Sequence, residues 1–184
     1  MRDFDKLEEL WDAGPAPLRG RGRVCLLVRR MGDEVHEEPA AVELSPAEGM
    51  AGDRWVHGRK GDAPDPEDQL TLMNVRAAEL VADAEHPLHM PGDNVLVDLD
   101  LAEDALPVGT RLRLGSAIIE ISAKPHLGCK KFAARFGPGA LRWVNVQSNR
   151  ARRLRGVNCR IVQAGSVAVG DPVEVVSTNA TVGA

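Results

Sequence analysis

The order of apolar and polar positions predicts a chain built mainly from short strands. Apolar or alternating runs occur at residues 23–30 (RVCLLVRR), 94–99 (NVLVDL) and 157–163 (VNCRIVQ). Further candidate strands are residues 35–44, 69–73 and 173–176. Residues 111–122 (RLRLGSAIIEIS) alternate on both sides of Gly115-Ser116, which is typical of a β-hairpin. Many short strands with a few helices between them predict a β-rich α+β fold, and a barrel satisfies this pattern.

Helical periodicity occurs between these strands. Within residues 1–22, apolar side chains recur at helical spacing at Phe4, Leu7, Leu10 and Trp11. Asn74 is placed to cap a second helix. Residues 131–136 are predicted to be helical and to end at Gly137-Pro138-Gly139, with two further short helical pieces in residues 140–156. The segment 164–172 (AGSVAVGDP) is predicted to be a turn.

Length and composition fit one globular domain. The chain has 184 residues, of which 43% are apolar and 27% charged, so it is large enough to bury its own core. We therefore divide it into an N-terminal arm with a short helix (1–22), a domain (23–177) and a flexible tail (178–184). No apolar run is long enough to span a membrane, and the acidic N-terminus does not resemble a secretory signal.

Three cysteines at wide spacing do not form a disulfide framework, which favours a reducing, cytoplasmic compartment. Cys25 and Cys159 lie inside predicted strands, so both are interpreted as packing residues. Val157, Cys159 and Ile161 share one face of their strand.

The net charge of −4 conceals an uneven distribution. Residues 121–170 hold ten basic side chains and no acidic one, whereas residues 1–120 carry a net charge of −12. A basic block of this kind favours an anionic ligand such as a phosphate, although a solvated basic face is the simpler alternative. RNA binding through the block is disfavoured because the chain has only six aromatic residues and no tyrosine to stack on bases.

Cys129 is the residue most suggestive of chemistry. It follows the loop sequence Pro-His-Leu-Gly and precedes two lysines at the start of a predicted helix. A thiol acts as a nucleophile or metal ligand as the thiolate. The positive N-terminus of the helix and neighbouring cations would lower its pKa, and the candidate cations are His126, Lys130, Lys131 and Arg135. A buried, inert cysteine is the alternative, but a turn beside glycine and two lysines is a poor core position.

Other motifs contribute less. Residues 50–61 form a loop rich in glycine and charge, in which Asp53, Arg54 and His57 are candidate site residues, although a lone loop histidine is more often solvated. The sequence contains no GxGxxG, GxxxxGK[ST], CxxC or HExxH pattern. Nucleotide-loop and zinc-enzyme interpretations therefore lack their motifs.

The chain resembles the MOSC domain family, named after the C-terminal region of molybdenum cofactor sulfurases. The matching pieces run in family order over residues 23–176. They are AGDRWVHG, QLTLMN, PGDNVLVDLDL, LPVGTRLRLGSAIIEIS, PHLGCKKFAARFG and RGVNCRIVQAGSVAVGDPVEV. The ordered set, with a cysteine immediately after the hairpin, is more specific than any single piece. It is most similar to the stand-alone bacterial members.

The resemblance implies a β-barrel with a few short peripheral helices, and it makes Cys129 a molybdenum ligand or a sulfur carrier. The basic block would then hold the phosphate and acidic groups of the pterin cofactor, with candidates Lys130, Lys131, Arg135, Arg142, Arg152 and Arg155. Family loop motifs place Asp53, Arg54, Asn94 and His126 around the same site. The loop reads His-Leu-Gly-Cys where many relatives have Pro-Cys, which implies a somewhat different cavity.

The resemblance leaves two functions open. One is a molybdenum-dependent oxidoreductase that reduces N-hydroxylated or N-oxide substrates with electrons from a separate donor protein. The other is a non-enzymatic protein that binds the cofactor or carries sulfur as a persulfide on Cys129. If the protein is an enzyme, a sulfur transferase is the alternative to the oxidoreductase. The family is also associated with pyridoxal phosphate. That cofactor binds the aminotransferase-like domain of the sulfurases, which this sequence does not contain, so it is not expected here.

Overall fold

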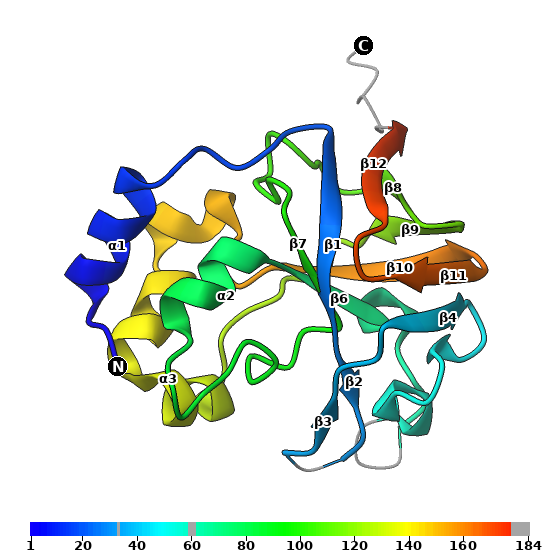
Figure 1. Ribbon diagram of the computed structural model, residues 1–184, viewed down its shortest axis with the longest axis horizontal. Helices are drawn as coiled ribbons and strands as arrows, with labels where there is room; N and C mark the ends of the chain where they lie inside the picture. Colours follow the sequence, from blue (N-terminus) through cyan, green and yellow to red (C-terminus); the bar gives the residue numbers. More distant parts are fainter. Residues whose placement is uncertain (33, 59–61, 178–184) are drawn as a thin grey trace.

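The computed structural model describes residues 1–32, 34–58 and 62–177, so the predicted flexible tail, 178–184, lies outside the described residues. The described chain forms a closed barrel with a layer of helices on one side (Figure 1). In the order in which they pair, the barrel strands are β1 (Arg21–Leu27), β12 (Pro172–Ser177), β8 (Arg111–Leu114), β9 (Ala117–Ile121), β10 (Val157–Gln163), β6 (Leu70–Asn74) and β7 (Val95–Val97). These strands confirm the predicted β-rich barrel.

The barrel closes through one parallel pair. β6 and β7 run parallel, and the chain between them includes the helix α2 (Val75–Val81). The other barrel neighbours are antiparallel, including the predicted hairpin, in which Leu114 of β8 pairs with Ala117 of β9. Asn74 caps α2 as predicted, because its side chain accepts a hydrogen bond from the Ala77 N–H.

Two small sheets flank the barrel. β4 (Ala41–Ser45) pairs with β5 (Gly49–Met50) and with β11 (Gly165–Ala168), and β2 (Arg29–Arg30) pairs with β3 (His36–Glu37). The prediction of a turn over 164–172 was therefore wrong in part. The glycines dominate the local pattern there, but Val167 is buried opposite Val42, and this long-range pairing selects a short strand.

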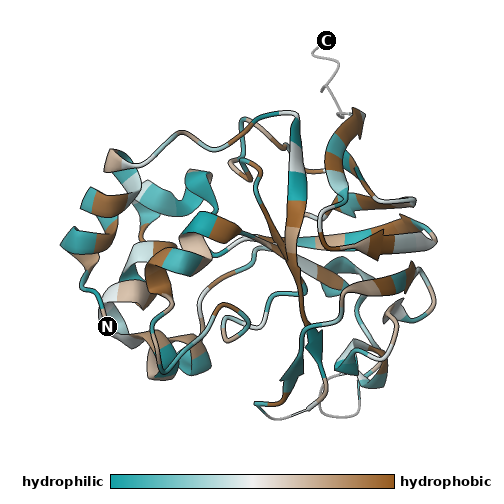
Figure 2. Ribbon diagram, viewed as in Figure 1, coloured by the Kyte–Doolittle hydropathy of each residue, from teal (hydrophilic) through white to brown (hydrophobic). Residues whose placement is uncertain are grey.

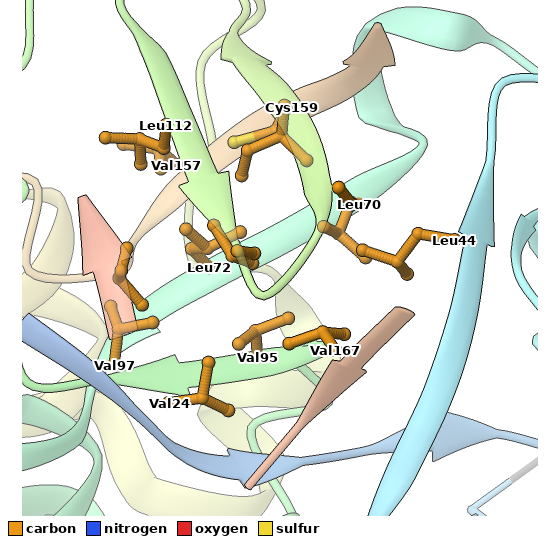
Figure 3. Packing of buried hydrophobic residues seen from close by; sticks show 14 of the residues in the cluster. Val24, Leu44, Leu70, Leu72, Val95, Val97, Leu112, Val157, Cys159 and Val167 are labelled. Carbon is orange, nitrogen blue, oxygen red and sulfur yellow. The ribbon is translucent and has the colours of Figure 1, made fainter. Parts of the chain in front are cut away.

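The barrel interior holds the larger of two apolar clusters (Figure 3). Val157, Cys159 and Ile161 on β10 all face it, which confirms the predicted inward face and the packing role of Cys159. Each fully buried aliphatic side chain of this kind contributes roughly 1.5–3 kcal/mol. Cys25 on β1 is only partly buried and lies outside the cluster, so its predicted packing role is weaker than that of Cys159.

The helical layer encloses the second apolar cluster. It consists of α1 (Phe4–Ala13), α2 and α3 (Lys130–Asn145), and each helix shows alternating apolar and polar segments in Figure 2. α3 is interrupted at Gly137, whose φ of 84° is non-helical, and it resumes at Pro138. The predicted break is thus a kink. α1 packs directly on it, because a Cβ added at Gly139 would lie 2.9 Å from Asp3 Cα.

The remaining described elements are three 3-10 helices, η1 (Arg54–His57), η2 (Pro66–Asp68) and η3 (Gln147–Arg152). None of the helices in the described ranges is both long and apolar enough to cross a bilayer. Loops that connect the barrel to the helical layer run between the two parts of the molecule (Figure 1). The candidate site combines residues of these loops with residues of β2, β3, η1 and α3.

Candidate functional site

The loop that carries Cys129 leaves the end of β9 and is fixed at both ends. On one side, the Asn158 side chain on β10 donates to the Lys124 and Pro125 carbonyls, at 3.1 and 3.2 Å. On the other side, Asn145 of α3 accepts from the Gly128 N–H at 2.8 Å and donates to the Gly128 carbonyl at 2.9 Å. These contacts set where α3 begins, and the residue at its N-cap is Cys129.

Gly128 packs closely against side chains of α3. A Cβ at this position would approach Leu141 Cδ1 to 2.9 Å and Val144 Cγ2 to 3.0 Å. The loop therefore lies directly on α3, and the following residue, Cys129, is turned outward and is exposed. The packing of the glycine thus places the thiol at the surface of the loop.

The environment of Cys129 favours its thiolate. Partial burial works to raise the pKa of the thiol. The backbone N–H groups of Phe132 and Lys131 at the start of α3, together with the charge of Arg155, outweigh that effect and bring the pKa below its ordinary value. A helix N-terminus stabilises an anion in this way because its first N–H groups have no partner within the helix.

The cations that lower this pKa differ from the prediction. Arg155 acts on the thiol, although the sequence pattern suggested His126, Lys130, Lys131 and Arg135. Burial and the charge of Arg155 lower the pKa of His126, although Asp93 works to raise it, so the imidazole is held neutral and supplies no positive charge. Lys130 is exposed and does not line the cavity described next. Its neighbour Lys131 does line that cavity, and successive residues of a helix point about 100° apart.

Cys129 opens into a cavity of about 370 Å³. Six cationic side chains line it, and so do two acidic ones, Glu34 and Asp68. The six are Arg30, Arg54, Lys124, Lys131, Arg135 and Arg155. They come from β2, η1, the loop after β9, α3 and the turn before β10, so residues far apart in the sequence contribute to one basic surface.

Asp53 and Asn94 hold one of these cations in place. The Asp53 carboxylate is buried and accepts from the Arg30 N–H and Nε, each at 2.9 Å, and from Arg30 Nη2 at 2.8 Å. Asn94 Nδ2 also donates to Asp53, at 2.9 Å. Burial works to raise the pKa of Asp53, but its contacts with Arg30 lower it overall. Asp53 and Asn94 thus act on Arg30, a residue that the sequence reasoning missed although it ends an apolar run.

A second buried network lies behind Cys129. Asp93 is fully enclosed, and its carboxylate bonds to His126 Nε2 at 2.7 Å and to Arg155 Nη1. Burial works to raise the pKa of Asp93, but Arg155 and His126 keep it below its ordinary value. Arg155 Nη2 also donates to the Pro91 carbonyl, at 3.0 Å. Asp93 was not singled out from the sequence, where a Gly-Asp-Asn turn gives no sign of burial.

The network leaves two polar atoms without partners. Because His126 Nε2 is bound to a carboxylate, it carries the proton of the neutral ring, and Nδ1 has no hydrogen-bond partner among the described residues. Arg155 Nε is buried and likewise has no partner within the described part of the chain. Both residues line the cavity.

The other predicted arginines divide into two groups. Arg54 and Arg135 line the cavity. Arg54 donates to the Gly32 carbonyl at 3.3 Å, and Arg135 pairs with Glu34 and donates to the Met90 carbonyl at 2.7 Å. Arg142 lies 4.3 Å above the Phe4 ring, and Arg152 pairs with Glu8 at 3.1 Å. Both therefore lie against α1 and away from the cavity.

The family model described as MOSC domain matches residues 54–174. A crystal structure of a hypothetical protein aligns with a TM-score of 0.64 and 20% identity, over 88% of this chain and 70% of that chain. The YuaD protein of Bacillus subtilis aligns with a TM-score of 0.58 and 18% identity, over 87% and 98%. YiiM from Escherichia coli aligns with a TM-score of 0.54 and 19% identity, over 84% and 70%. No curated protein sequence matches the chain.

Proposed function

The chain belongs to the MOSC domain family, and from this premise we propose that it binds a molybdenum cofactor with Cys129 as the protein ligand of the metal. The observation that carries the proposal is an exposed thiol with a lowered pKa that opens into a cavity lined by six cations. A thiolate is a soft ligand of the kind that thiophilic metals select. The family as a whole is associated with this cofactor.

The size and the charged lining of the cavity support binding of the anionic part of such a cofactor. Its volume of about 370 Å³ is within the ordinary range for small-molecule sites. Arg30 and Arg155 are fixed from behind by buried carboxylates, so their guanidinium groups are held in position before a ligand arrives. Arginine forks bind phosphate in a bidentate manner, and Arg54 and Lys131 at the cavity wall add further positive charge.

The reaction we favour is reduction of an N-hydroxylated substrate. Cleavage of an N–O bond in this way consumes two electrons and two protons and releases water. The bound cofactor would supply two-electron exchange, and a separate electron-donor protein would replace the electrons. His126 is placed to move a proton, because its Nδ1 has no partner among the described residues and its Nε2–H is fixed on Asp93.

The first test is molybdenum and pterin analysis of the protein expressed in a host that makes the cofactor. We expect the wild type to contain both in stoichiometric amounts, and Cys129→Ser to lose the molybdenum. Cys25→Ser is the matched control, because Cys25 lies on β1 and does not line the cavity. Absence of molybdenum from every protein, or equal loading of Cys129→Ser and wild type, would contradict the proposal.

A second candidate is a sulfur carrier. No other described cysteine lines the cavity, so a persulfide on Cys129 would face no neighbouring thiol that could remove the sulfur. Cys129 would accept a sulfane sulfur from a donor persulfide, which is left as a thiol. Mass spectrometry of protein exposed to such a donor would show one added sulfur on the Cys129 peptide. The carrier function is supported over the enzyme if sulfur is added while molybdenum is absent.

A further inference from the structure

A second cavity, of about 220 Å³, adjoins the first. The two cavities share the segment 124–127, Arg155 and Asn158, but Cys129 does not line the second one. Its own walls come from the loop after β7, from α3, from η3 and from the turn that follows η3. The residues that contribute to it alone include Glu103, Val108, Val144, Arg150, Arg153 and Gly156. It is therefore a separate chamber on the other part of the basic block.

Arg153 is poorly compensated in this chamber. Its side chain is 14% exposed, and its nearest carboxylate oxygen, on Glu103, lies 4.0 Å from Nε. At that distance the contact is not a hydrogen bond. Burial lowers the pKa of Arg153, and the charge of Glu103 does not offset this. A partly buried guanidinium gains from a close anionic partner, because desolvation of its charge is otherwise poorly compensated.

The guanidinium of Arg153 also has donors to spare. A guanidinium carries five N–H donors, and Nη1 of Arg153 donates to the Leu106 carbonyl at 2.6 Å. No other hydrogen bond of this side chain is made to the described residues. Arg150, one turn earlier, is exposed and has no side-chain partner in the same part of the structure. Arg155 Nε, in the wall shared by both cavities, is buried and equally unpartnered among the described residues.

The backbone holds Arg153 in place at an energetic cost. Arg153 has φ 48° and ψ 46°, in the left-handed region that is unfavourable for residues other than glycine. The Gly156 N–H donates to the Arg153 carbonyl at 2.7 Å, and a Cβ at Gly156 would lie 2.0 Å from the Leu72 carbonyl oxygen on β6. The turn is therefore fixed against the barrel. Strain of this kind is a reason to look for a function at the residue that bears it.

We propose that the second cavity is a binding site for a phosphate-class oxyanion, with Arg150 and Arg153 as its principal ligands. The guanidinium groups of Arg150 and Arg153, three residues apart, keep N–H donors that bond to none of the described residues, and such donors match the paired oxygens of a phosphate. The volume leaves room for a phosphate group with several waters, or for a small phosphate ester. The proposal does not require that the cofactor binds at Cys129, since the two cavities have different principal ligands.

The test is calorimetric titration of the cofactor-free, full-length protein with inorganic phosphate in a phosphate-free buffer. We expect one binding event, weakened about tenfold or more by Arg153→Leu and by a smaller factor in Arg150→Leu. The matched control is Arg113→Leu, which removes an exposed arginine of β8 that forms no ion pair with the described residues and lies outside the cavity. Arg113→Leu should bind phosphate as the wild type does.

Glu103→Gln gives a result that misfolding cannot imitate. Glu103 is the acidic residue of the cavity, and removing its charge should tighten phosphate binding several-fold by lowering repulsion. The proposal is overturned if the wild type shows no saturable binding at millimolar phosphate. It is equally overturned if Arg153→Leu and Arg113→Leu bind alike, or if Glu103→Gln does not bind more tightly.

A last arm identifies the source of the phosphate. The same titration is repeated with protein that carries the pterin cofactor. Loss of the binding event would show that the phosphate of the cofactor itself occupies the cavity. Retention of the event would show that the site serves a free phosphate or another phosphate ester. Either outcome supports an oxyanion site, whereas failure of cofactor loading alone bears only on the function proposed for Cys129.

Discussion

The N-terminus of α3 and the barrel interior each hold a cysteine, and the surroundings of the two thiols are opposite in character. Cys159 lies on β10 between Leu70 of β6 and Ile121 of β9, with no exposed surface. Burial raises its pKa far above the ordinary value, and the charge of Arg153 offsets little of this. Cys129 is exposed, and despite the effect of partial burial its pKa is lowered by backbone N–H groups and by Arg155.

The difference shows that the groups around the sulfur decide its chemistry. The apolar cluster offers Cys159 no donor, so only the neutral thiol is tolerated there. At Cys129 the loop ends where a helix begins, and Arg155 approaches from a separate segment. Arg155 in turn keeps its position because Asp93 and the Pro91 carbonyl hold it. The reactive state of Cys129 therefore depends on a buried network that does not include the cysteine.

The largest effect is expected from breaking that network. Arg155→Met keeps much of the side-chain volume but leaves the Asp93 carboxylate buried without its main partner, which should cost about 3–5 kcal/mol of stability. The pKa of Cys129 should rise as well, because the charge of Arg155 is one of the contributions that lower it. Urea denaturation measures the first change, and the pH dependence of thiol alkylation measures the second.

Arg113→Met is the control for this prediction, since Arg113 is exposed on β8. Surface substitutions of this kind change stability by no more than about 0.5 kcal/mol. If Arg155→Met destabilises the protein no more than Arg113→Met, then Arg155 does not compensate Asp93. The proposed link from Asp93 through Arg155 to Cys129 would then be wrong.

Local patterns predicted most of the fold. The hairpin around Gly115-Ser116, the inward face of β10 and the helical stripe of α1 all depend on neighbours in the sequence, and the structure contains each of them. β11 could not be predicted in the same way. Its pairing with β4 joins residues more than 120 positions apart, and its own segment consists mainly of small residues.

The same limit applies to the candidate site. The basic block predicted an anionic ligand, but acidic residues from the first 120 positions pair with several of its cations. Arg152 pairs with Glu8, Arg135 with Glu34, and Lys124 with Asp68. Counting charges along the chain cannot show this, because ion pairs form between elements that only the fold brings together. Arg30 and Asp93 were missed for the same reason.

A smaller loss of stability is expected when each cysteine is replaced by serine, and its size should differ between Cys159 and Cys129. Cys159→Ser places a hydroxyl in the apolar barrel interior without a partner, which should cost about 1–3 kcal/mol. Cys129→Ser changes an exposed residue and should alter stability by less than about 0.5 kcal/mol. Urea denaturation of both variants in reducing buffer gives the comparison. Equal losses of stability would mean that Cys129 packs in the protein much as Cys159 does.

The smallest effect is in the pH dependence of stability, where the two cysteines should act with opposite sign. In the unfolded chain both thiols titrate at roughly 8.5. The folded protein lowers the pKa of Cys129, so between the two pKa values the unfolded chain binds more protons than the folded one. The stability of the wild type relative to Cys129→Ser then rises with pH. The stabilisation that Cys129 contributes is fully present above the unfolded pKa and is lost as pH falls through the folded pKa.

The folded protein raises the pKa of Cys159, so above the unfolded pKa it is the folded state that keeps the additional proton. Stability should therefore fall with rising pH relative to Cys159→Ser, because ionisation of the thiol favours unfolding. Urea denaturation of the wild type and both serine variants between pH 6 and 10, with reductant present, measures the two differences. If the two stability differences change with pH in the same direction, the pKa of one of the two thiols is not shifted as its surroundings predict. A flat profile for Cys129 would remove the electrostatic basis for its proposed role as a metal ligand.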